Sequence, residues 1–207
     1  MEDPVSRTGK PDKSGIRAAP WQFMVRFVLA FVLAYILWHL TAPLANRVFT
    51  YVSGNIVMML DRADYTKSVK SVGRYIVVAY EPTKDGKPLT LEYKGFTFNT
   101  VFLVALIMAV PKVDYQLRLK ILFLGLVILF PLQVFKFVIY VFNHYCQNMR
   151  RRSGAYIYPA YMFHAIGYAD RVMWRIDGQI VPVMIWAGLF YYYKWHNIFT
   201  RLKKGAR

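Results

Sequence analysis

Residues 119–142 read LKILFLGLVILFPLQVFKFVIYVF, and this stretch decides the fold class. It exceeds the roughly 20 apolar residues that a helix needs to cross a bilayer, and it contains no acidic residue. Pro131 lies inside it and predicts a kink, because proline removes one backbone hydrogen bond and crowds the preceding turn. The stretch therefore predicts a transmembrane helix.

Three further stretches share this apolar character. The whole chain of 207 residues is 57% hydrophobic and only 18% charged, whereas about a quarter of the residues are charged in an average soluble domain. This composition argues against an ordinary soluble enzyme and favours a membrane protein. The predicted spans are residues 21–41, 96–110, 119–142 and 179–195.

The segments between these spans predict a layer on the exported side of the membrane. In the exported segment 42–95, an apolar stripe at helical spacing predicts an amphipathic helix over residues 43–60, either lying at the membrane interface or capping the other helices. Two β-rich stretches around Asp85–Gly86 predict a small β-hairpin, which would pack on this helix or on a partner's sheet edge. A second interfacial helix is predicted over residues 160–176, within an exported loop 143–177. The members of the first stripe are Leu44, Val48, Val52, Ile56 and Met59, whereas Asn46, Arg47, Thr50 and Ser53 lie off it.

The predicted fold class is therefore mainly α: a polytopic membrane protein with about four transmembrane helices, interfacial amphipathic helices and a small exported β-hairpin. Residues 21–195 form a single membrane domain, and the basic segments 1–20 and 196–207 are flexible tails. A cleaved signal peptide within residues 1–40 is an alternative for the N-terminal part, and it would leave the remaining topology unchanged.

The distribution of charge predicts the orientation. Lys and Arg number 27 against 11 acids, for a net charge of +16. Basic residues are roughly twice as dense on the side that holds both termini, so both termini are predicted to be cytoplasmic. Positive loops and anionic phospholipid headgroups account for the excess, and nucleic acid is not a predicted partner. The triplet Arg150, Arg151 and Arg152 then lies on the exported side, where it would bind lipid phosphates or, alternatively, another anionic partner.

Few residues of the sequence indicate a catalytic or metal-binding site. The single cysteine, Cys146, excludes an internal disulfide and a cysteine-based zinc site, and no nucleotide-binding fingerprint is present. Together with His39, His144 and His164 it could supply metal ligands, but the spacing matches no ligand pattern, so neither a metal nor a cofactor is predicted. A nucleophilic pair of Cys146 and His164 is the alternative that would make the chain an enzyme.

Other residues suggest contacts with partner proteins. Ala30 and Ala34 form a small-xxx-small pair that would let another helix approach closely. Lys136 is a cation inside a predicted span, so we expect it to extend to the interface or to pair with an acid on another subunit. Leu91 and Tyr93 lie on the predicted hairpin, where they would contact a partner.

The order of these parts resembles a known family. After one span and an exported segment of helix and strands come FNTVFLVALIMAVP (98–111), LRLKILFLGLVILFPLQVFKF (117–137) and GQIVPVMIWAGLF (178–190). This arrangement is similar to that of the small membrane proteins encoded alongside bacterial exosortases, of the exosortase H-associated type. Exosortases themselves are membrane transpeptidases thought to use Cys, Arg and His, and FHAIGYA (163–169) resembles their His-containing segment. Their nucleophile motif is absent, and Cys146 stands in HYCQN instead.

The resemblance implies an accessory protein in a bacterial inner membrane. We therefore expect a non-catalytic accessory or structural subunit that binds other integral membrane proteins through its spans and its exported hairpin. Two alternatives remain open: an exosortase-like transpeptidase that uses Cys146 and His164, and a binder of anionic lipid or polyanion that uses Arg150–Arg152.

Overall fold

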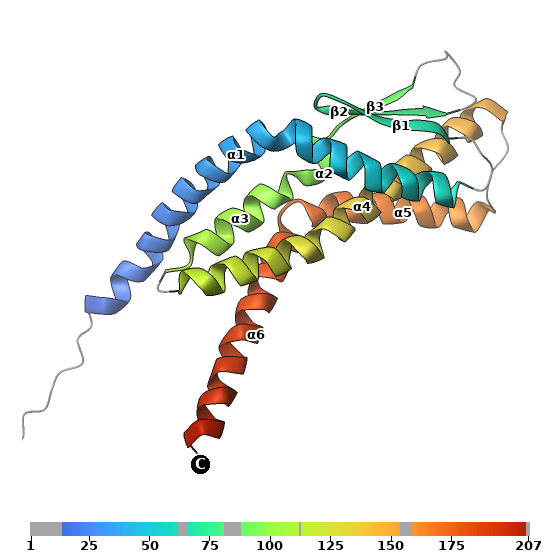
Figure 1. The fold of residues 1–207 in the computed structure, drawn as a ribbon. Coiled ribbons are helices and arrows are strands. Elements are labelled where there is room, and N and C mark those ends of the chain that lie inside the picture. The colour runs from blue at the N-terminus through green and yellow to red at the C-terminus, as the bar shows by residue number, and fades with distance from the viewer. Residues whose placement is uncertain (1–13, 62–65, 81–87, 112, 154–158, 206–207) are drawn as a thin grey trace, which may run out of the picture.

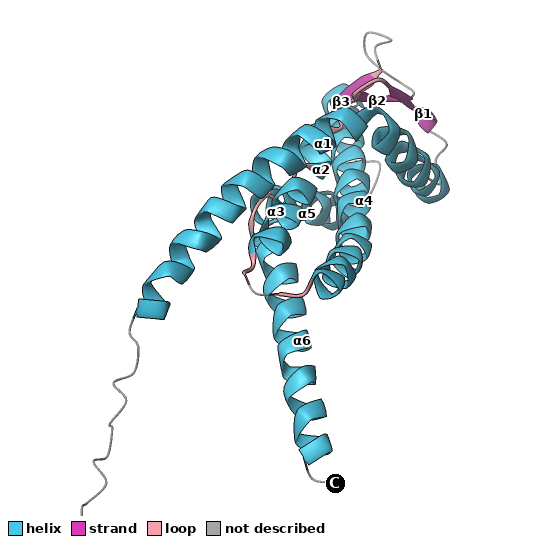
Figure 2. Cartoon of the chain, turned by 60° about the vertical axis from the view of Figure 1, so that its left-hand side comes forward, coloured by secondary structure: helices cyan, strands magenta, loops and turns pink. Residues whose placement is uncertain are grey.

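The structure is a computed structural model that describes residues 14–61, 66–80, 88–111, 113–153 and 159–205; within these ranges, the side chains of 14–20, 80, 149–153 and 194–205 are not described. It is mainly helical, with one small antiparallel sheet (Figure 1). Figure 2 shows the sheet at one end of the molecule, with the N-terminal part of α1 and the C-terminal part of α6 extending away from it.

Helix α1 (Ser14–Leu60) joins two elements that the sequence analysis separated. It runs without a break through Pro43, so the predicted separate helix over residues 43–60 is the second half of a 47-residue helix, and helical structure begins before residue 21. Figure 1 shows that α1 changes direction part-way along its length. Proline inside a helix and hydroxyl bonds to the preceding turn both bend helices, and Thr41 Oγ1 donates to the carbonyl of Leu37 at 2.9 Å.

The second half of α1 buries three polar residues that lie off the predicted apolar stripe. Two members of the stripe, Leu44 and Val48, are 68% and 55% exposed, whereas Val52 and Ile56 are half-buried against the core. Each buried polar group has a partner: Asn46 Nδ2 donates to the carbonyls of Gly73 and Tyr75, and hydroxyls nearby donate to α1 itself. The buried polar residues are Asn46, Thr50 and Ser53. In an apolar environment such as a membrane, polar groups are most stable when they are hydrogen-bonded to one another inside the protein while apolar side chains face outward.

The sheet has three strands, β1 (Thr66–Val72), β2 (Tyr75–Tyr80) and β3 (Leu89–Glu92), in the order β1-β2-β3 with antiparallel pairing. The predicted hairpin corresponds to β2 and β3, and its turn at Asp85–Gly86 lies outside the described residues. The first strand was missed. It reaches β2 through a tight turn in which Gly73 has φ 60°, a conformation that glycine adopts without strain.

The sheet covers the second half of α1, as the sequence analysis expected for the hairpin. Ile76 and Val78 are fully buried in the main core, together with Phe49 and Val57 of α1. A Cβ added at Gly54 would lie only 2.9 Å from the Cβ of Val69. Glycine at this position therefore allows α1 and β1 to approach each other closely.

The remaining chain is helical. The second predicted span appears as α2 (Lys94–Thr97) and α3 (Asn99–Ala109), and the third as α4 (Tyr115–Ser153), which continues through Pro131 well beyond residue 142. Helix α5 (Ala160–Asp177) confirms the helix predicted over residues 160–176. Helix α6 (Ile180–Gly205) includes the last predicted span and continues into the segment predicted as a tail.

In the part of the chain that the structure describes, two helices are long and apolar enough to cross a membrane. They are the segment Trp21–Leu60 of α1 and the segment Tyr115–Asn148 of α4, whereas Lys94–Ala109 and Ile180–Tyr193 are shorter apolar helical segments. The apolar side chains of the α1 segment are mostly exposed, in contrast to the core helix of a soluble protein. A membrane arrangement with four spans stays a prediction.

A buried polar centre and an apolar groove

The most polar part of the interior is centred on Lys136 of α4. Its Nζ lies 2.7 Å from Oδ2 of Asp177, at the end of α5, and both side chains are 3% exposed. The same ammonium donates to the carbonyl of Gly95 at 2.9 Å and lies 3.9 Å from the centre of the Trp174 ring. A buried cation is tolerated when an acid, a carbonyl and an aromatic face replace its hydration. Lys136 is thus buried and pairs with an acid of its own chain, in place of the expected extension to the interface or pairing with an acid on another subunit.

Three more side chains extend this centre into a network. Asn99 Nδ2 donates to the second carboxylate oxygen of Asp177 at 2.7 Å, and Gln133 Nε2 donates to Asn99 Oδ1 and to Thr100 Oγ1. Asn99 and Thr100 begin α3, and Gln133 lies one turn before Lys136 on α4. The network thus holds the junction between α5 and α6 against α3 and α4. We refer to Lys136, Asp177, Asn99, Gln133 and Thr100 as the polar centre.

Sequence reasoning found Lys136 but missed Asp177. The acid lies 41 residues further along, outside every predicted span, so nothing in the local pattern joins it to the lysine. One signal was available: Asp177 ends an amphipathic helix directly before Gly178 and an apolar stretch. A carboxylate at a helix C-terminus is repelled by the partial negative charge of the helix dipole, so a nearby cation is expected to compensate it.

A second, smaller polar contact joins α4 to α5. Asn143 Nδ2 donates to Oδ2 of Asp170 at 2.7 Å, and both residues are buried. The other oxygen of Asp170, Oδ1, is enclosed and has no hydrogen-bond partner among the described residues. Asp170 is thus less completely compensated than Asp177.

An apolar groove runs along the seam between α1 and α4. It consists of two neighbouring hollows of about 420 Å³ and 400 Å³, and Phe130 lines both. Gln133 and Thr100 line the first hollow, so the polar centre reaches the floor of the groove. The α1 wall contains four members of the predicted apolar stripe, of which Leu44 and Val48 are exposed and Val52 and Ile56 also pack against the core. We call this surface the α1–α4 groove; its main walls are Thr41, Leu44, Ala45, Val48, Val52, Ile56 and Leu60 on α1 and Leu126, Phe130, Val134 and Val138 on α4.

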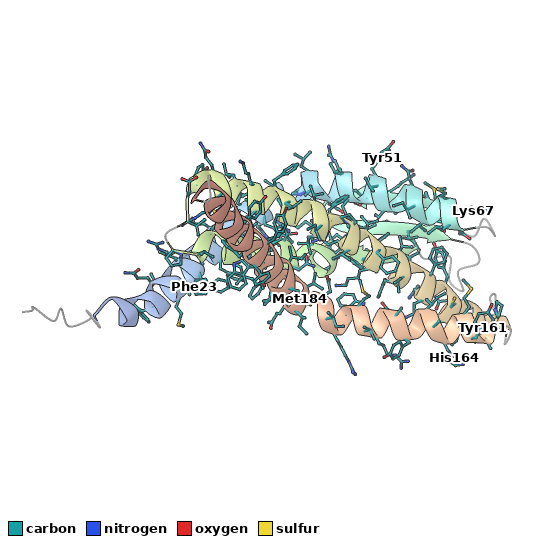
Figure 3. The ribbon with its side chains drawn as sticks, turned by 90° about the horizontal axis from the view of Figure 1, so that it is seen from below. Phe23, Tyr51, Lys67, Tyr161, His164 and Met184 are labelled. Carbon is teal, nitrogen blue, oxygen red and sulfur yellow. The ribbon has the colours of Figure 1, made fainter. Side chains whose placement is uncertain are left out.

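The two residues of the candidate catalytic pair lie in different environments. Cys146 is buried on α4, in surroundings where a thiol is inert. His164 is exposed on α5, and Figure 3 shows it at the outer edge of the molecule. No hydrogen bond between them is recorded. Among the described residues, no group of three or more His, Cys, Asp or Glu side chains is placed to hold a metal ion.

The residues predicted to contact partners have mixed positions. Leu91 and Tyr93 are buried in the chain's own core, so their side chains do not face a partner, and this prediction is corrected. Ala34 packs against the same core and Ala30 is half-buried. The triplet Arg150–Arg152 lies in the last turns of α4, and its side chains are outside the described residues.

The family follows from a comparison of the sequence with known families. A family model described as exosortase H-associated membrane protein matches residues 17–192. The chain belongs to this family. The match covers the sheet, helices α2 to α5, nearly all of α1 and the first half of α6, and it confirms the resemblance that the sequence suggested. The family is named for its association with exosortase H and not as the exosortase itself. No curated protein and no solved structure matches the chain.

Proposed function

We propose that this member of the exosortase H-associated family is a non-catalytic accessory subunit that binds exosortase H within the membrane. The observation that carries the proposal is the apolar surface of α1. Large apolar side chains are exposed along most of its length, from Trp21 to Leu60, while the polar side chains of Asn46, Thr50 and Ser53 are buried and hydrogen-bonded. Exposed apolar surface of this extent needs lipid or protein to cover it.

The internal polar groups support the same role. The polar centre uses its donors and acceptors to hold α3, α4 and α5 together, with a geometry that suits a scaffold. Burial of Cys146 and exposure of His164 speak against a nucleophilic pair. The family description, which names an associated membrane protein, agrees with a role beside the enzyme.

We further propose a bacterial inner-membrane location with four spans and both termini in the cytoplasm, so that the sheet and α5 lie on the exported side. The charge of that side supports contact with anionic phospholipids. Its described aspartates Asp61, Asp170 and Asp177 are buried and bonded within the chain, so among the described residues of that side the exposed charges apart from Glu92 are basic. Basic side chains at a membrane surface attract anionic headgroups. The exposed basic residues include Arg47, Lys67, Lys70, Arg74, Arg171 and Arg175.

Co-purification tests the proposed function. The tagged full chain is extracted from its native membrane with a gentle detergent, sized, and its companions are identified by mass spectrometry. We expect exosortase H at a fixed stoichiometry, whereas an unrelated membrane protein with the same tag should not retain it. A lone chain, or a homo-oligomer without exosortase H, would overturn the proposal.

A cysteine substitution tests the catalytic alternative separately. Because Cys146 is enclosed in the core, Cys146→Ala should leave the processing of exported proteins unchanged, as followed by their size on immunoblots. Retained co-purification of exosortase H would show that the variant is folded. Loss of processing by a variant that still binds exosortase H would restore the enzymatic interpretation.

A further inference from the structure

Helix α5 separates its charges by sign. Its two aspartates, Asp170 and Asp177, are buried and bonded to side chains of α4. Its two arginines, Arg171 and Arg175, are exposed. Because the arginines are four positions apart, they lie on the same side of the helix, where like charges repel each other. No ion pair between either arginine and a described acid is recorded. This side of α5 therefore presents two positive charges that the described part of the chain does not neutralise.

The same side of α5 carries aromatic rings with a polar tip. Tyr161, His164 and Tyr168 precede the arginines at intervals of three or four residues, so all five positions form one exposed stripe along the helix. Tyr161 and Tyr168 are 76% and 66% exposed, and Figure 3 shows Tyr161 and His164 at the outer edge of the molecule. Tyrosine and arginine side chains are typical of the boundary between membrane and water, because each has an apolar part and a polar end.

Two contacts between α4 and α5 indicate the depth of this stripe. Asp177 pairs with Lys136 of α4. Seven residues earlier on α5, Asp170 accepts a bond from Asn143, which lies seven residues later on α4, so the two helices run antiparallel and in step. Figure 1 shows them side by side. In the proposed topology the third span ends at residue 142, so the first contact lies inside this span and the second lies directly beyond it. The last two turns of α5 thus lie at the outer end of the span.

This register places the two arginines at the level of the lipid headgroups. Arg171 is level with the outer end of the span, and Arg175 lies one helical turn deeper. A long arginine side chain at this depth extends its charged end towards the headgroups. A guanidinium group binds phosphate through two parallel hydrogen bonds. Two arginines one turn apart can hold one phosphate group between them, and Tyr168, one turn before Arg171, has a hydroxyl donor on the same stripe.

We propose that Arg171 and Arg175 bind the phosphate of one anionic phospholipid in the leaflet on the exported side, with Tyr168 as a further hydrogen-bond donor. The inference rests on the proposed four-span location and names the residues that would make the lipid contact. An anionic lipid also relieves the repulsion between the two arginines. A zwitterionic lipid offers the same phosphate together with a cation that the arginines repel, so the site should select an anionic headgroup.

Lipid titration followed by native mass spectrometry tests this site. The full chain, freed of lipid in detergent, is titrated with dioleoyl phosphatidylglycerol or with dioleoyl phosphatidylcholine, and the dissociation constant of the first lipid to bind is measured. The two lipids have the same acyl chains, so a difference reports on the headgroup. We expect phosphatidylglycerol to bind at least about tenfold more tightly. Equal affinity for the two lipids would overturn the proposal.

Paired substitutions test where the lipid binds. Arg171→Gln combined with Arg175→Gln should weaken phosphatidylglycerol binding about tenfold. The matched control, Lys67→Gln combined with Lys70→Gln, removes the same charge from exposed residues of β1 instead of α5, and it should stay within about twofold of wild type. The size-exclusion profile checks that both variants fold. Equal weakening by the two variants would show diffuse attraction to the basic surface and would rule out a site on α5.

A conservative variant and a soluble competitor complete the test. Arg171→Lys combined with Arg175→Lys keeps both charges, and lysine also binds phosphate, so its affinity should remain within about threefold of wild type. If the lysine variant lost as much affinity as the glutamine variant, charge would not be what binds the lipid and the proposal would fail. Glycerol phosphate lacks the acyl chains that hold a lipid beside the span, so a large excess should not displace phosphatidylglycerol. Displacement would indicate a site for a soluble anion instead.

The outcomes separate the two proposals. If wild-type chain retains exosortase H but does not prefer phosphatidylglycerol, the lipid site is wrong and the accessory role stands. If it binds phosphatidylglycerol through the two arginines but retains no exosortase H, the accessory role fails and the lipid site stands. If the glutamine variant binds phosphatidylglycerol as wild type does but loses exosortase H, the stripe contacts that protein and the lipid site is wrong.

Discussion

Two aspartates on helix α5 meet helix α4 in different ways. Asp177, at the end of α5, receives bonds on both carboxylate oxygens, from Lys136 and from Asn99. Asp170, two turns earlier, receives one bond from Asn143, and its other oxygen is enclosed without a partner among the described residues. Burying a carboxylate is costly unless its oxygens are paired. The comparison indicates that polar contacts hold the end of α5 to α4 more strongly than they hold its middle.

The largest effect is expected where the full pairing is broken. Lys136→Met keeps a straight, buried side chain but removes the charge that compensates Asp177. An uncompensated buried carboxylate costs about 3–5 kcal/mol, so we expect a large loss of thermal stability in detergent. The measurement is the temperature at which half of the chain is lost from the monodisperse peak on size exclusion.

A double variant checks the physical reason for this loss. Lys136→Met combined with Asp177→Leu removes both charges, and replacing a buried ion pair by apolar residues is often neutral. Asn99 then loses its acceptor, which retains part of the cost. We expect the double variant to be more stable than Lys136→Met alone. If it were less stable, the pair would not act through charge compensation.

An intermediate effect is expected at the weaker attachment. Asn143→Leu removes the one recorded donor to Asp170, which leaves its buried carboxylate without a bond to the described part of the chain. Loss of a partner at a buried polar group costs about 1–3 kcal/mol. The matched control is Gln147→Leu, because Gln147 bonds to Asn143 and is itself exposed. Equal stability of the two variants in the same thermal assay would contradict the role of Asn143.

The sequence predicted the structure best where an element is determined by the pattern of its own residues. The contrast between the faces of residues 160–176 predicted α5 almost to the residue. Strand β1 was missed because the two valines of TKSVKSV, Val69 and Val72, are three positions apart and so do not show the alternation of a strand, and because its place depends on pairing with β2. The continuity of α1 was also missed, since Pro43 is usually a sign of a helix boundary.

The burial of α1 could not be predicted from its pattern alone. In water the apolar stripe is expected to face the core, but Asn46 and Thr50 are buried and bonded while Leu44 and Val48 face outward. Which face of α1 is buried depends on whether water or an apolar environment surrounds the helix. It also depends on the carbonyls of Gly73 and Tyr75, which accept hydrogen bonds from Asn46 although they lie 27 and 29 positions further along the chain. Similarly, Lys136 finds Asp177 only because the fold brings the end of α5 to α4. The candidate site is thus a property of the tertiary structure.

The smallest effect is expected from Asp170→Asn, and the same change at Asp177 is its matched comparison. Asp170→Asn keeps the acceptor for Asn143 and removes a charge that lacks full compensation, so its stability should stay within about 1 kcal/mol of wild type. Asp177→Asn keeps an acceptor too but leaves the buried charge of Lys136 without its counter-ion, so it should be clearly less stable. Comparable thermal stability of the two variants, side by side in one detergent, would show that the aspartates are equivalent. A clear gap would show that Lys136 distinguishes them, because the substitutions are chemically identical and both sites are buried against α4.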